Sequence, residues 1–181
     1  MNLKPIKLLF LFILSIFISN CSSDDSSDNT PNQPENQVTF NGTSYSITTA
    51  WINDENTTTN DPSEIGVNLS NKTTEEINSG NDLTNITRVY FDFDDVTVQE
   101  TTYTQITDYD FSINGSVTNG VFNDGTVLLS DEDPLSDFYA SSGSVIINSI
   151  SESTVNLEFT FTRNDGQVIS GSYFGNYIDP N

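Results

Sequence analysis

The sequence predicts an all-β domain. The expected architecture is an antiparallel β-sandwich, and the alternative is a small antiparallel β-barrel, a lipocalin-like meander. Short runs alternate apolar and polar residues with a period of two, and Asn-Gly or Asp-Gly pairs separate several of them. No segment of useful length carries the 3.6-residue apolar period of a helix. About eight to ten short strands with closely spaced turns are typical of sandwiches and small barrels.

A β-hairpin is expected where the alternation begins. In VTFNGTSYSI (Val38–Ile47), apolar residues alternate on both sides of Asn41-Gly42, a pair favoured in type I′ turns. We expect the second strand of this hairpin to continue to Trp51. Another strand is expected over residues 64–70, where apolar residues again recur at every second position.

The middle of the chain is expected to contain one irregular strand. Residues 71–85 lack periodicity and are expected to form an insertion or a short helical turn. In ITRVYFDFDDVTVQ (86–99), the apolar positions change parity after Asp95. One extra residue in an alternating strand is typical of a β-bulge, which we place near Asp94-Asp95.

Turn signals and alternation continue to the C-terminus. The pairs expected to form turns are Asn114-Gly115, Asn119-Gly120 and Asp124-Gly125. The clearest strand is TVNLEFTFTR (154–163), whose Val, Leu and two Phe are expected to point inward and whose intervening residues are expected to point outward. A turn at 164–166 leads to the last strand.

The charge of the chain excludes two classes of partner. Asp and Glu number 26, Lys and Arg number 5, and His is absent, which gives a formal net charge of −21. Lys4 and Lys7 lie in the N-terminal stretch, so the rest of the chain is more acidic still. Such a surface repels nucleic-acid phosphates and lacks the basic residues that anionic lipids attract. The acid excess favours solubility, with cation binding as the alternative.

The residue inventory argues against catalysis. Because His is absent and the one Cys lies outside the expected domain, Ser-His-Asp and Cys-His systems and His- or thiolate-rich metal sites are excluded. Paired carboxylates remain: Asp92 and Asp94 are two residues apart on a strand, roughly 7 Å, and Asp108 and Asp110 repeat this spacing. Glycoside hydrolases use carboxyl pairs at such distances. Solvated strand faces explain these acids more simply, so we expect no enzyme.

The remaining candidate site residues are aspartates and aromatics. We expect no cofactor, with Ca²⁺ as the alternative, because acidic loops supply the oxygen ligands that this ion takes. The Ca²⁺ candidates are Asp92, Asp94, Asp95, Asp131, Asp133 and Asp137. The ligand-binding candidates are Trp51, Tyr90 and Tyr109, which lie beside polar residues on expected strands. These rings either stack on a sugar or sit at sheet edges with their polar tips in water.

The N-terminal segment has the composition of an export signal. Met1–Lys7 carries two positive charges, and Leu8–Ile18 is a run of eleven apolar or small residues. Eleven helical residues cover only about half of a ~30 Å hydrocarbon core, so a permanent membrane span is not expected. The only cysteine, Cys21, follows directly after Ile18-Ser19-Asn20.

This N-terminus resembles that of bacterial lipoproteins. Ile18 and Ser19 match the lipobox that precedes the lipidated Cys, whereas Asn20 stands where Gly or Ala is usual and is similar to a Bacteroidetes variant. The run CSSDDSSDN resembles the acidic export signal of flavobacterial-type surface lipoproteins. The resemblance implies cleavage before Cys21, lipid on its sulfur, and display on the outer face of the outer membrane. Two or three acyl chains, at ~0.8 kcal/mol per buried CH₂, hold a soluble domain stably.

The C-terminal third is similar to many small Bacteroidetes surface lipoproteins, most of which have no assigned activity. The matching residues are Gly143, Val145, Ile147, Phe159, Phe161, Asp165, Gly166, Gly171 and Tyr173. This resemblance implies a fold class and a location, without a chemistry.

Three parts are therefore expected along the chain: a lipoprotein signal peptide (1–20), a flexible acidic Ser/Asp/Asn/Pro tether (21–37) and a single all-β domain (38–181). The expected protein is lipid-anchored in the outer membrane and faces the cell exterior. We expect a non-catalytic binding or adhesion module for a glycan or an envelope protein, without a nucleic-acid partner. The alternatives are a structural envelope component, stabilised by Ca²⁺, and a carboxylate-dependent glycoside hydrolase.

Replacing the lipidated residue tests the expected anchor. In Cys21→Ser, no thioether can form, so the protein is expected to leave the membrane fraction and appear in the soluble fraction. Fractionation of cells that express the wild-type or the variant chain measures this. A variant that still pellets with outer membranes contradicts the lipoprotein interpretation.

Overall fold

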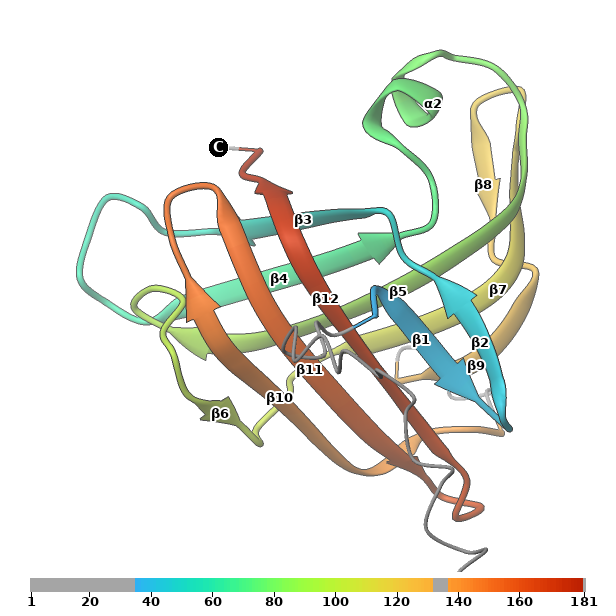
Figure 1. Cartoon of the computed structure of the whole chain (residues 1–181). Coiled ribbons are helices and arrows are strands. Elements are labelled where there is room, and N and C mark those ends of the chain that lie inside the picture. The colour runs from blue at the N-terminus through green and yellow to red at the C-terminus, as the bar shows by residue number, and fades with distance from the viewer. Residues whose placement is uncertain (1–34, 132–136, 181) are drawn as a thin grey trace, which may run out of the picture. The chain divides into compact units, whose positions relative to one another are not determined.

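The computed structural model describes residues 35–131 and 137–180 (Figure 1). The expected signal peptide (1–20) and nearly all of the expected tether (21–37) lie outside the described residues. The described part is built almost wholly of strands, with one short helix, α2 (Thr74–Asn78). The strands are β1 (Gln37–Phe40), β2 (Thr43–Ser46), β3 (Thr49–Asp54), β4 (Ser63–Ser70), β5 (Leu83–Asp95), β6 (Thr102–Tyr103), β7 (Tyr109–Thr118), β8 (Val121–Asn123), β9 (Thr126–Ser130), β10 (Ala140–Ile150), β11 (Thr154–Arg163) and β12 (Val168–Ile178).

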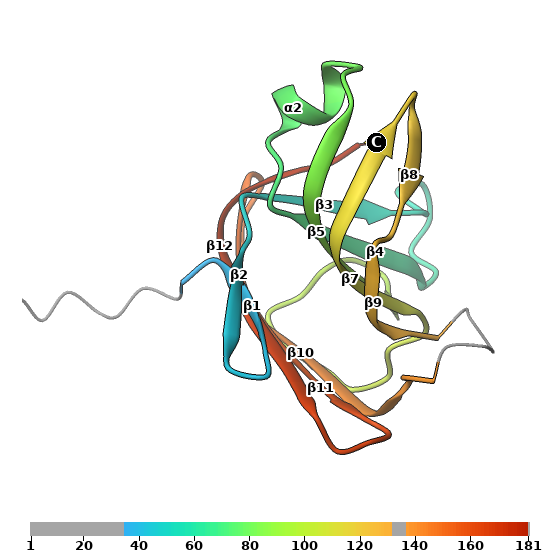
Figure 2. The same cartoon turned by 90° about the vertical axis from the view of Figure 1, so that its right-hand side faces the viewer.

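The strands form two layers that face each other. Layer A has the order β6-β10-β11-β12-β1-β2, and layer B has the order β3-β4-β5-β7, with β8 and β9 both paired to β7. The strands of layer A cross those of layer B in Figure 1, and Figure 2 shows the layers from the side. The ends of the strand path, β6 and β8, do not meet. The prediction of an all-β, sandwich-like fold is confirmed, and the sheet is not closed into a barrel.

One parallel contact joins the two layers. Tyr177 and Ile178, at the end of β12, pair in parallel with Ala50 and Trp51 of β3. The other strand pairs of the described residues are antiparallel. The expectation of a purely antiparallel sheet is therefore wrong at this junction, where the last strand reaches past layer A to the first strand of layer B.

The space between the layers is filled by aromatic side chains. Phe111 of layer B contacts Phe161 and Phe159 of layer A, with ring centroids 4.9 and 5.6 Å apart. Phe91 contacts the same two rings at 6.2 and 5.6 Å. Each pair adds about 0.5–1.5 kcal/mol to the hydrophobic gain from burial. The predicted inward face of β11 is confirmed, because Val155, Leu157, Phe159 and Phe161 are all buried.

Glycines beside β11 make room for its two large rings. Gly171 of β12 is the cross-strand partner of Phe159, and Gly143 of β10 is the partner of Phe161. A β-carbon on Gly171 would lie 2.3 Å from Cζ of Phe159 and 2.6 Å from the carbonyl oxygen of Gln37. A β-carbon on Gly143 would lie 2.8 Å from Cε1 of Phe161. Both glycines are therefore required by close packing.

A buried arginine ties the end of β11 to layer B. Arg163 is only 4% exposed, and its Nη1 donates to the carbonyl oxygen of Leu128 in β9 at 3.0 Å. Its Nη2 and Nε donate to the carboxylate of Asp165 at 2.7 and 3.2 Å, which lowers the pKa of Asp165. Its guanidinium carbon lies 3.5 Å from the ring centroid of Phe138. The charge of Arg163 is thus paired with Asp165 inside the domain.

The turn predictions are partly confirmed. Asn41 and Gly42 have φ of 50° and 73°, and Asn119-Gly120 has φ of 52° and 76°, as a type I′ turn requires. The expected bulge at Asp94-Asp95 is wrong, because the ladder between β4 and β5 is regular from Ser63–Asp95 to Ser70–Arg88 and the strand then ends. The parity change belongs to the loop after Asp95.

The expected continuation of the second strand to Trp51 is also wrong. β2 ends at Ser46, and β3 begins at Thr49 in the other layer. Because the chain changes layer here, the inward positions become Ala50 and Ile52, which are 0% and 4% exposed. Trp51 therefore points outward from layer B.

A kink runs across layer B in place of an expected turn. β7 continues through Asn114-Gly115, and β8 and β9 run back along it. Positive φ angles occur at Asn85 (55°) of β5, at Asn114 (56°) of β7 and at Gly125 (70°), which directly precedes β9. The register of β5 on β7 also shifts twice between Leu83 and Arg88. Beyond this line, β5, β7 and β8 curve away from the sandwich toward α2 (Figure 1).

Filling the space above Gly171 is expected to destabilise the domain. Gly171→Ala forces a β-carbon against Phe159 and the Gln37 carbonyl, an overpacking that costs about 1–3 kcal/mol. The free energy of unfolding is measured by urea denaturation. Gly66→Ala is the matched control, because the nearest atoms to its β-carbon would lie at an ordinary 3.4 Å. Equal stability of the two variants would contradict the packing argument.

Candidate functional site

The outward face of layer B carries a row of polar and aromatic residues. Trp51 of β3 pairs with Asn68 of β4, Asn68 pairs with Tyr90 of β5, and Tyr90 pairs with Asp110 of β7. Directly paired residues on adjacent antiparallel strands share one face of the sheet. The row therefore crosses four strands on the side away from the aromatic core.

Two adjacent pockets lie along this row. Pocket 1 has a volume of about 500 Å³, and pocket 2 has a volume of about 260 Å³. Both are lined by Trp51 and Asn68, so the indole ring lies between them. Pocket 1 falls within the range of ~300–1,000 Å³ that is typical of small-molecule sites.

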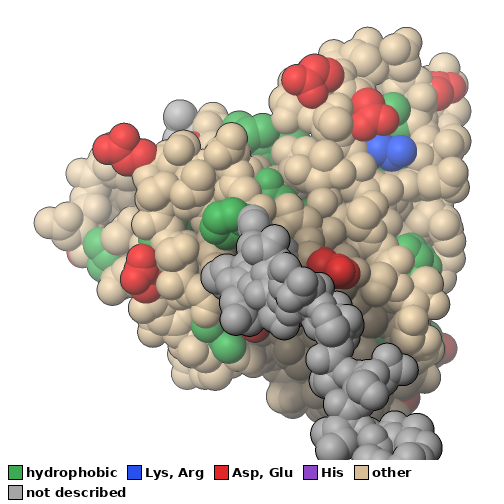
Figure 3. Space-filling model, viewed as in Figure 1, with side chains coloured by type: hydrophobic (Ala, Val, Ile, Leu, Met, Phe, Trp, Pro, Cys, Tyr) green, Lys and Arg blue, Asp and Glu red, His purple; other side chains and the backbone are tan. Residues whose placement is uncertain are grey.

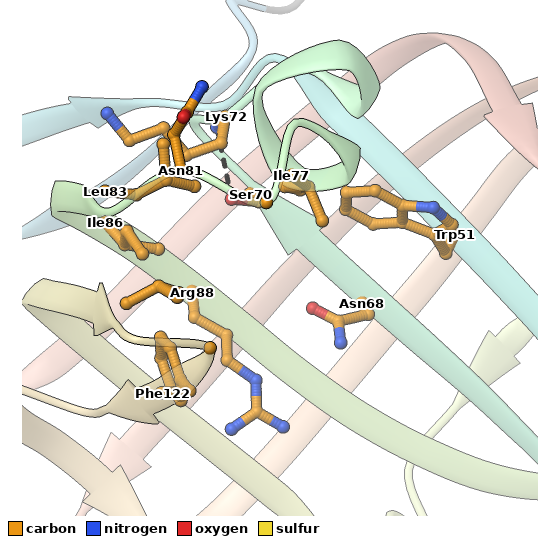
Figure 4. A pocket seen from close by; sticks show the side chains of 13 residues that line it. Trp51, Asn68, Ser70, Lys72, Ile77, Asn81, Leu83, Ile86, Arg88 and Phe122 are labelled. Atoms are coloured by element: carbon orange, nitrogen blue, oxygen red, sulfur yellow. Dashed lines mark hydrogen bonds between the residues drawn. The ribbon is translucent and has the colours of Figure 1, made fainter.

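The kink and the short helix form the walls of pocket 1. Thr73 caps α2: Glu76 N donates to Thr73 Oγ1 at 3.2 Å, and Thr73 N donates to Glu76 Oε2 at 2.8 Å. The apolar wall residues are Trp51, Ile77, Leu83, Ile86, Val117 and Phe122. Figure 4 shows Trp51 and Phe122 on opposite sides of the pocket, with Ile77 above and Arg88 extending between them. Ile77 and Phe122 are 42% and 39% exposed, so both apolar side chains are accessible at the pocket wall.

Arg88 is held firmly at one end of pocket 1. Its Nη1 lies 2.7 Å from Oδ2 of Asp110 and 3.8 Å from Oδ1 of Asp124. Its guanidinium carbon lies 5.6 Å from the ring centroid of Tyr90 and 5.8 Å from that of Phe122. These contacts fix the direction of the guanidinium fork without burying it, since the side chain is 30% exposed.

Pocket 2 has the opposite electrostatic character. Glu55 and Glu64 line it together with Trp51 and Tyr90. Desolvation and the nearby carboxylate of Asp92 raise the pKa of Glu64. The wall of pocket 2 is therefore acidic and polar, with two aromatic rings.

Tyr90 is fixed between a glycine and a buried carboxylate. A β-carbon on Gly66 would lie 3.4 Å from the Tyr90 ring, so the ring covers this glycine. The Tyr90 hydroxyl donates to Oδ2 of Asp92 at 3.0 Å, and burial together with this carboxylate raises the pKa of Tyr90. Asp92 is 2% exposed, and its Oδ1 accepts from Asp108 N at 2.7 Å and from the Thr107 hydroxyl. Asp92 thus positions Tyr90.

The three aromatic candidates separate in the structure. Trp51 and Tyr90 both lie at the pockets on the outward face. Tyr109 faces the core instead, where its ring lies 5.6 Å from that of Phe161 and its hydroxyl accepts from Ala140 N at 3.0 Å. Tyr109 is therefore removed from the candidate site, because its strand position places it between the two layers.

Among the described residues, the aspartates proposed as Ca²⁺ ligands do not converge. The Asp92 oxygens accept from three protein donors. Asp95 accepts from Tyr103 Oη at 2.9 Å and from Gln99 Nε2 at 3.1 Å, and so orders the loop after β5. Asp94, Asp131 and Asp137 are exposed, and Asp133 lies outside the described residues. Within residues 35–131 and 137–180, no three acidic side chains gather in a metal-binding group.

In each carboxylate pair proposed for hydrolysis, one member is held by other protein groups. Asp92 is enclosed, as described above, whereas Asp94 is exposed. Asp110 binds Arg88. Neither pair presents two free carboxylates to a shared cleft.

Asn68, Lys72, Arg88 and Phe122 line pocket 1 but were not predicted as site residues. Asn68 lies on β4, Arg88 on β5 and Phe122 on β8. Lys72 lies in the segment between β4 and α2, and only the folded layer brings the four residues together. One signal was available for two of them: Lys72 and Arg88 are two of only three basic residues after Cys21.

Comparison with protein-family models, curated proteins and solved structures gives no match to this chain. In the described part of the chain, no helix is long and apolar enough to cross a membrane.

Removing the Tyr90 hydroxyl is expected to destabilise the domain by roughly 1–3 kcal/mol. In Tyr90→Phe, the buried Asp92 carboxylate loses one of its three donors, and an unsatisfied buried charge is costly. Urea denaturation at neutral pH measures the effect. The control is Tyr139→Phe, because Tyr139 is 54% exposed and is expected to change stability by no more than about 0.5 kcal/mol. A Tyr90→Phe variant as stable as the wild type would show that Asp92 does not need this donor.

Proposed function

We propose that the chain is a lipid-anchored protein of the outer membrane, displayed on the cell exterior, whose β domain binds glycans without catalysis. The N-terminal motif ending at Cys21 supports the anchor, and the composition of residues 21–37 supports a tether between lipid and domain. The taxonomic assignment to Bacteroidetes rests on the same motif.

The row of Trp51, Asn68 and Tyr90 is the observation that carries the glycan proposal. A sugar ring has an apolar face and a rim of hydroxyls. An exposed indole packs against such a face, and amide or carboxylate groups beside it bind the hydroxyls. The row offers two aromatic side chains with Asn68 between them, and Asn53 and Glu64 lie in the adjoining pocket.

The side chains of the row are held in place before any ligand binds. Trp51, Asn68 and Tyr90 lie on β3, β4 and β5, whose opposite faces are buried in the core. Tyr90 is held further by Asp92. Pre-positioned side chains lose little entropy on binding, which improves affinity for a small polar ligand.

Two other functions are less well supported. A Ca²⁺-stabilised structural component has no converging acidic ligands in the described residues. A carboxylate-dependent hydrolase needs two accessible carboxyls, and Asp92 is enclosed by its donors. An envelope protein remains the alternative ligand if no glycan binds.

A glycan array probed with the purified chain, followed by calorimetry on the best ligands, tests the proposal. Trp51→Ala is expected to weaken binding tenfold or more, because it removes the ring shared by both pockets. Phe174→Ala is the matched control: Phe174 is 39% exposed on β12 of layer A, away from both pockets, and its loss is expected to leave affinity unchanged. A wild-type chain that retains no glycan, or a Trp51→Ala variant that binds as the wild type does, contradicts the proposal.

A further inference from the structure

Pocket 1 brings together two of the few basic side chains of a strongly acidic protein. The chain has 26 acidic and 5 basic residues, and only Lys72, Arg88 and Arg163 are basic after Cys21. Arg163 is buried and bound to Asp165. Both remaining cations line pocket 1, and none of its thirteen lining residues is Asp or Glu. On the face drawn in Figure 3, acidic side chains are scattered, while Lys or Arg shows at a single place toward α2.

The Arg88 fork has donors available for a ligand anion. Both of its ion pairs, to Asp110 and Asp124, are made through Nη1. The N–H groups of Nη2 and Nε make no ion pair or hydrogen bond with any described residue. Two parallel N–H donors on a planar guanidinium match the two oxygens of a carboxylate. The Asp110 contact and the flanking Tyr90 and Phe122 rings hold the fork in place before a ligand arrives.

The remaining walls indicate what carries that anion. A bare inorganic anion gains nothing from an apolar wall, whereas Trp51, Ile77, Leu83 and Phe122 fit a ring or chain with apolar surface. Lys72 and Asn81 add polar groups at the far end of the pocket from Arg88 (Figure 4). The chemistry of pocket 1 is therefore that of an anionic ligand with an apolar face, which a uronic acid possesses.

Pocket 2 sets the character of the neighbouring unit. Glu55 and Glu64 line it, so a second anion there would be repelled, whereas the hydroxyls of a neutral sugar would find acceptors. Trp51 and Asn68 are shared by both pockets, which makes the two sites continuous.

We propose that the domain recognises an acidic oligosaccharide, with the carboxylate of a uronic acid bound to Arg88 in pocket 1 and a neutral sugar in pocket 2, on either side of Trp51. This inference rests on the proposed glycan-binding function and specifies its ligand class. It also specifies which pocket takes the acidic unit and which takes the neutral one.

The test compares one ligand with and without its charge. The probe is an oligosaccharide of neutral sugars that ends in a single glucuronic acid, and the reference is its methyl ester, which keeps the ring and removes the anion. Calorimetry with the full purified chain is expected to show at least tenfold tighter binding of the acid than of the ester. Raising the salt concentration is expected to reduce this ratio, because the contact to an exposed arginine is screened.

Variants test whether Arg88 causes the preference for the acid over the ester. Arg88→Gln is expected to lower the affinity for the acid to that for the ester, and Arg88→Lys is expected to restore only part of the difference, because an ammonium lacks the planar fork. Phe174→Ala is expected to keep the full ratio. Thermal melts of each variant confirm that it is folded, and the wild-type ratio stands as a test even if a variant fails to fold.

The possible outcomes separate this inference from the proposal beneath it. Equal binding of acid and ester by the wild type overturns the acidic-ligand inference and leaves glycan binding intact. A preference for the acid that persists in a folded Arg88→Gln variant overturns the assignment to Arg88. Binding of neither probe, while the array retains another glycan, also overturns the inference. An array that retains no glycan overturns both.

Discussion

The rest of the structure depends on the packing of Phe159 and Phe161 of β11 against Phe91 and Phe111 of layer B. No disulfide can form within the domain, because the only cysteine precedes it, so packing and hydrogen bonds between the layers hold them together. Gly143 and Gly171 leave room for the rings of Phe161 and Phe159, because a β-carbon at either position would contact them. The buried guanidinium of Arg163 bonds to Leu128 of layer B at one end of the same interface. Because the inward faces supply the stability, the outward face of layer B is free to carry Trp51, Tyr90 and Arg88.

The site itself arises from an irregularity in layer B. Asn85 of β5, Asn114 of β7 and Gly125, which directly precedes β9, take left-handed backbone conformations, and the sheet bends there. The bend raises the ends of β5, β7 and β8, with α2 beside them, above the flat part of the layer, and pocket 1 lies on the concave side. A straight sheet of the same sequence would offer the aromatic row without the enclosing walls. The residues that bend the sheet are therefore different from the residues whose side chains line the pocket.

Some of this was predictable from local pattern, and some was not. The Asn41-Gly42 hairpin and the inward face of β11 follow from turn chemistry and period-two alternation, which act over a few residues. The parity of Tyr90 with Asp92 also placed both on one face. Asn114-Gly115 has the same local preference for positive φ as a turn, but here it kinks a paired strand, because β8 and β9 continue the ladder on its far side. The same conformational freedom serves a turn or a bend, and only long-range pairing selects between them.

The sequence by itself determined that this chain forms layers of strands and that its domain lacks thiol and imidazole chemistry. Period, composition and motif are local properties, so they need no knowledge of distant contacts. The tertiary structure alone decided that Tyr109 faces the core, that Asp92 supports Tyr90, and that Lys72 and Arg88 meet at one pocket. These facts depend on which strands become neighbours and on where the sheet bends, and both depend on pairing between segments far apart in the chain.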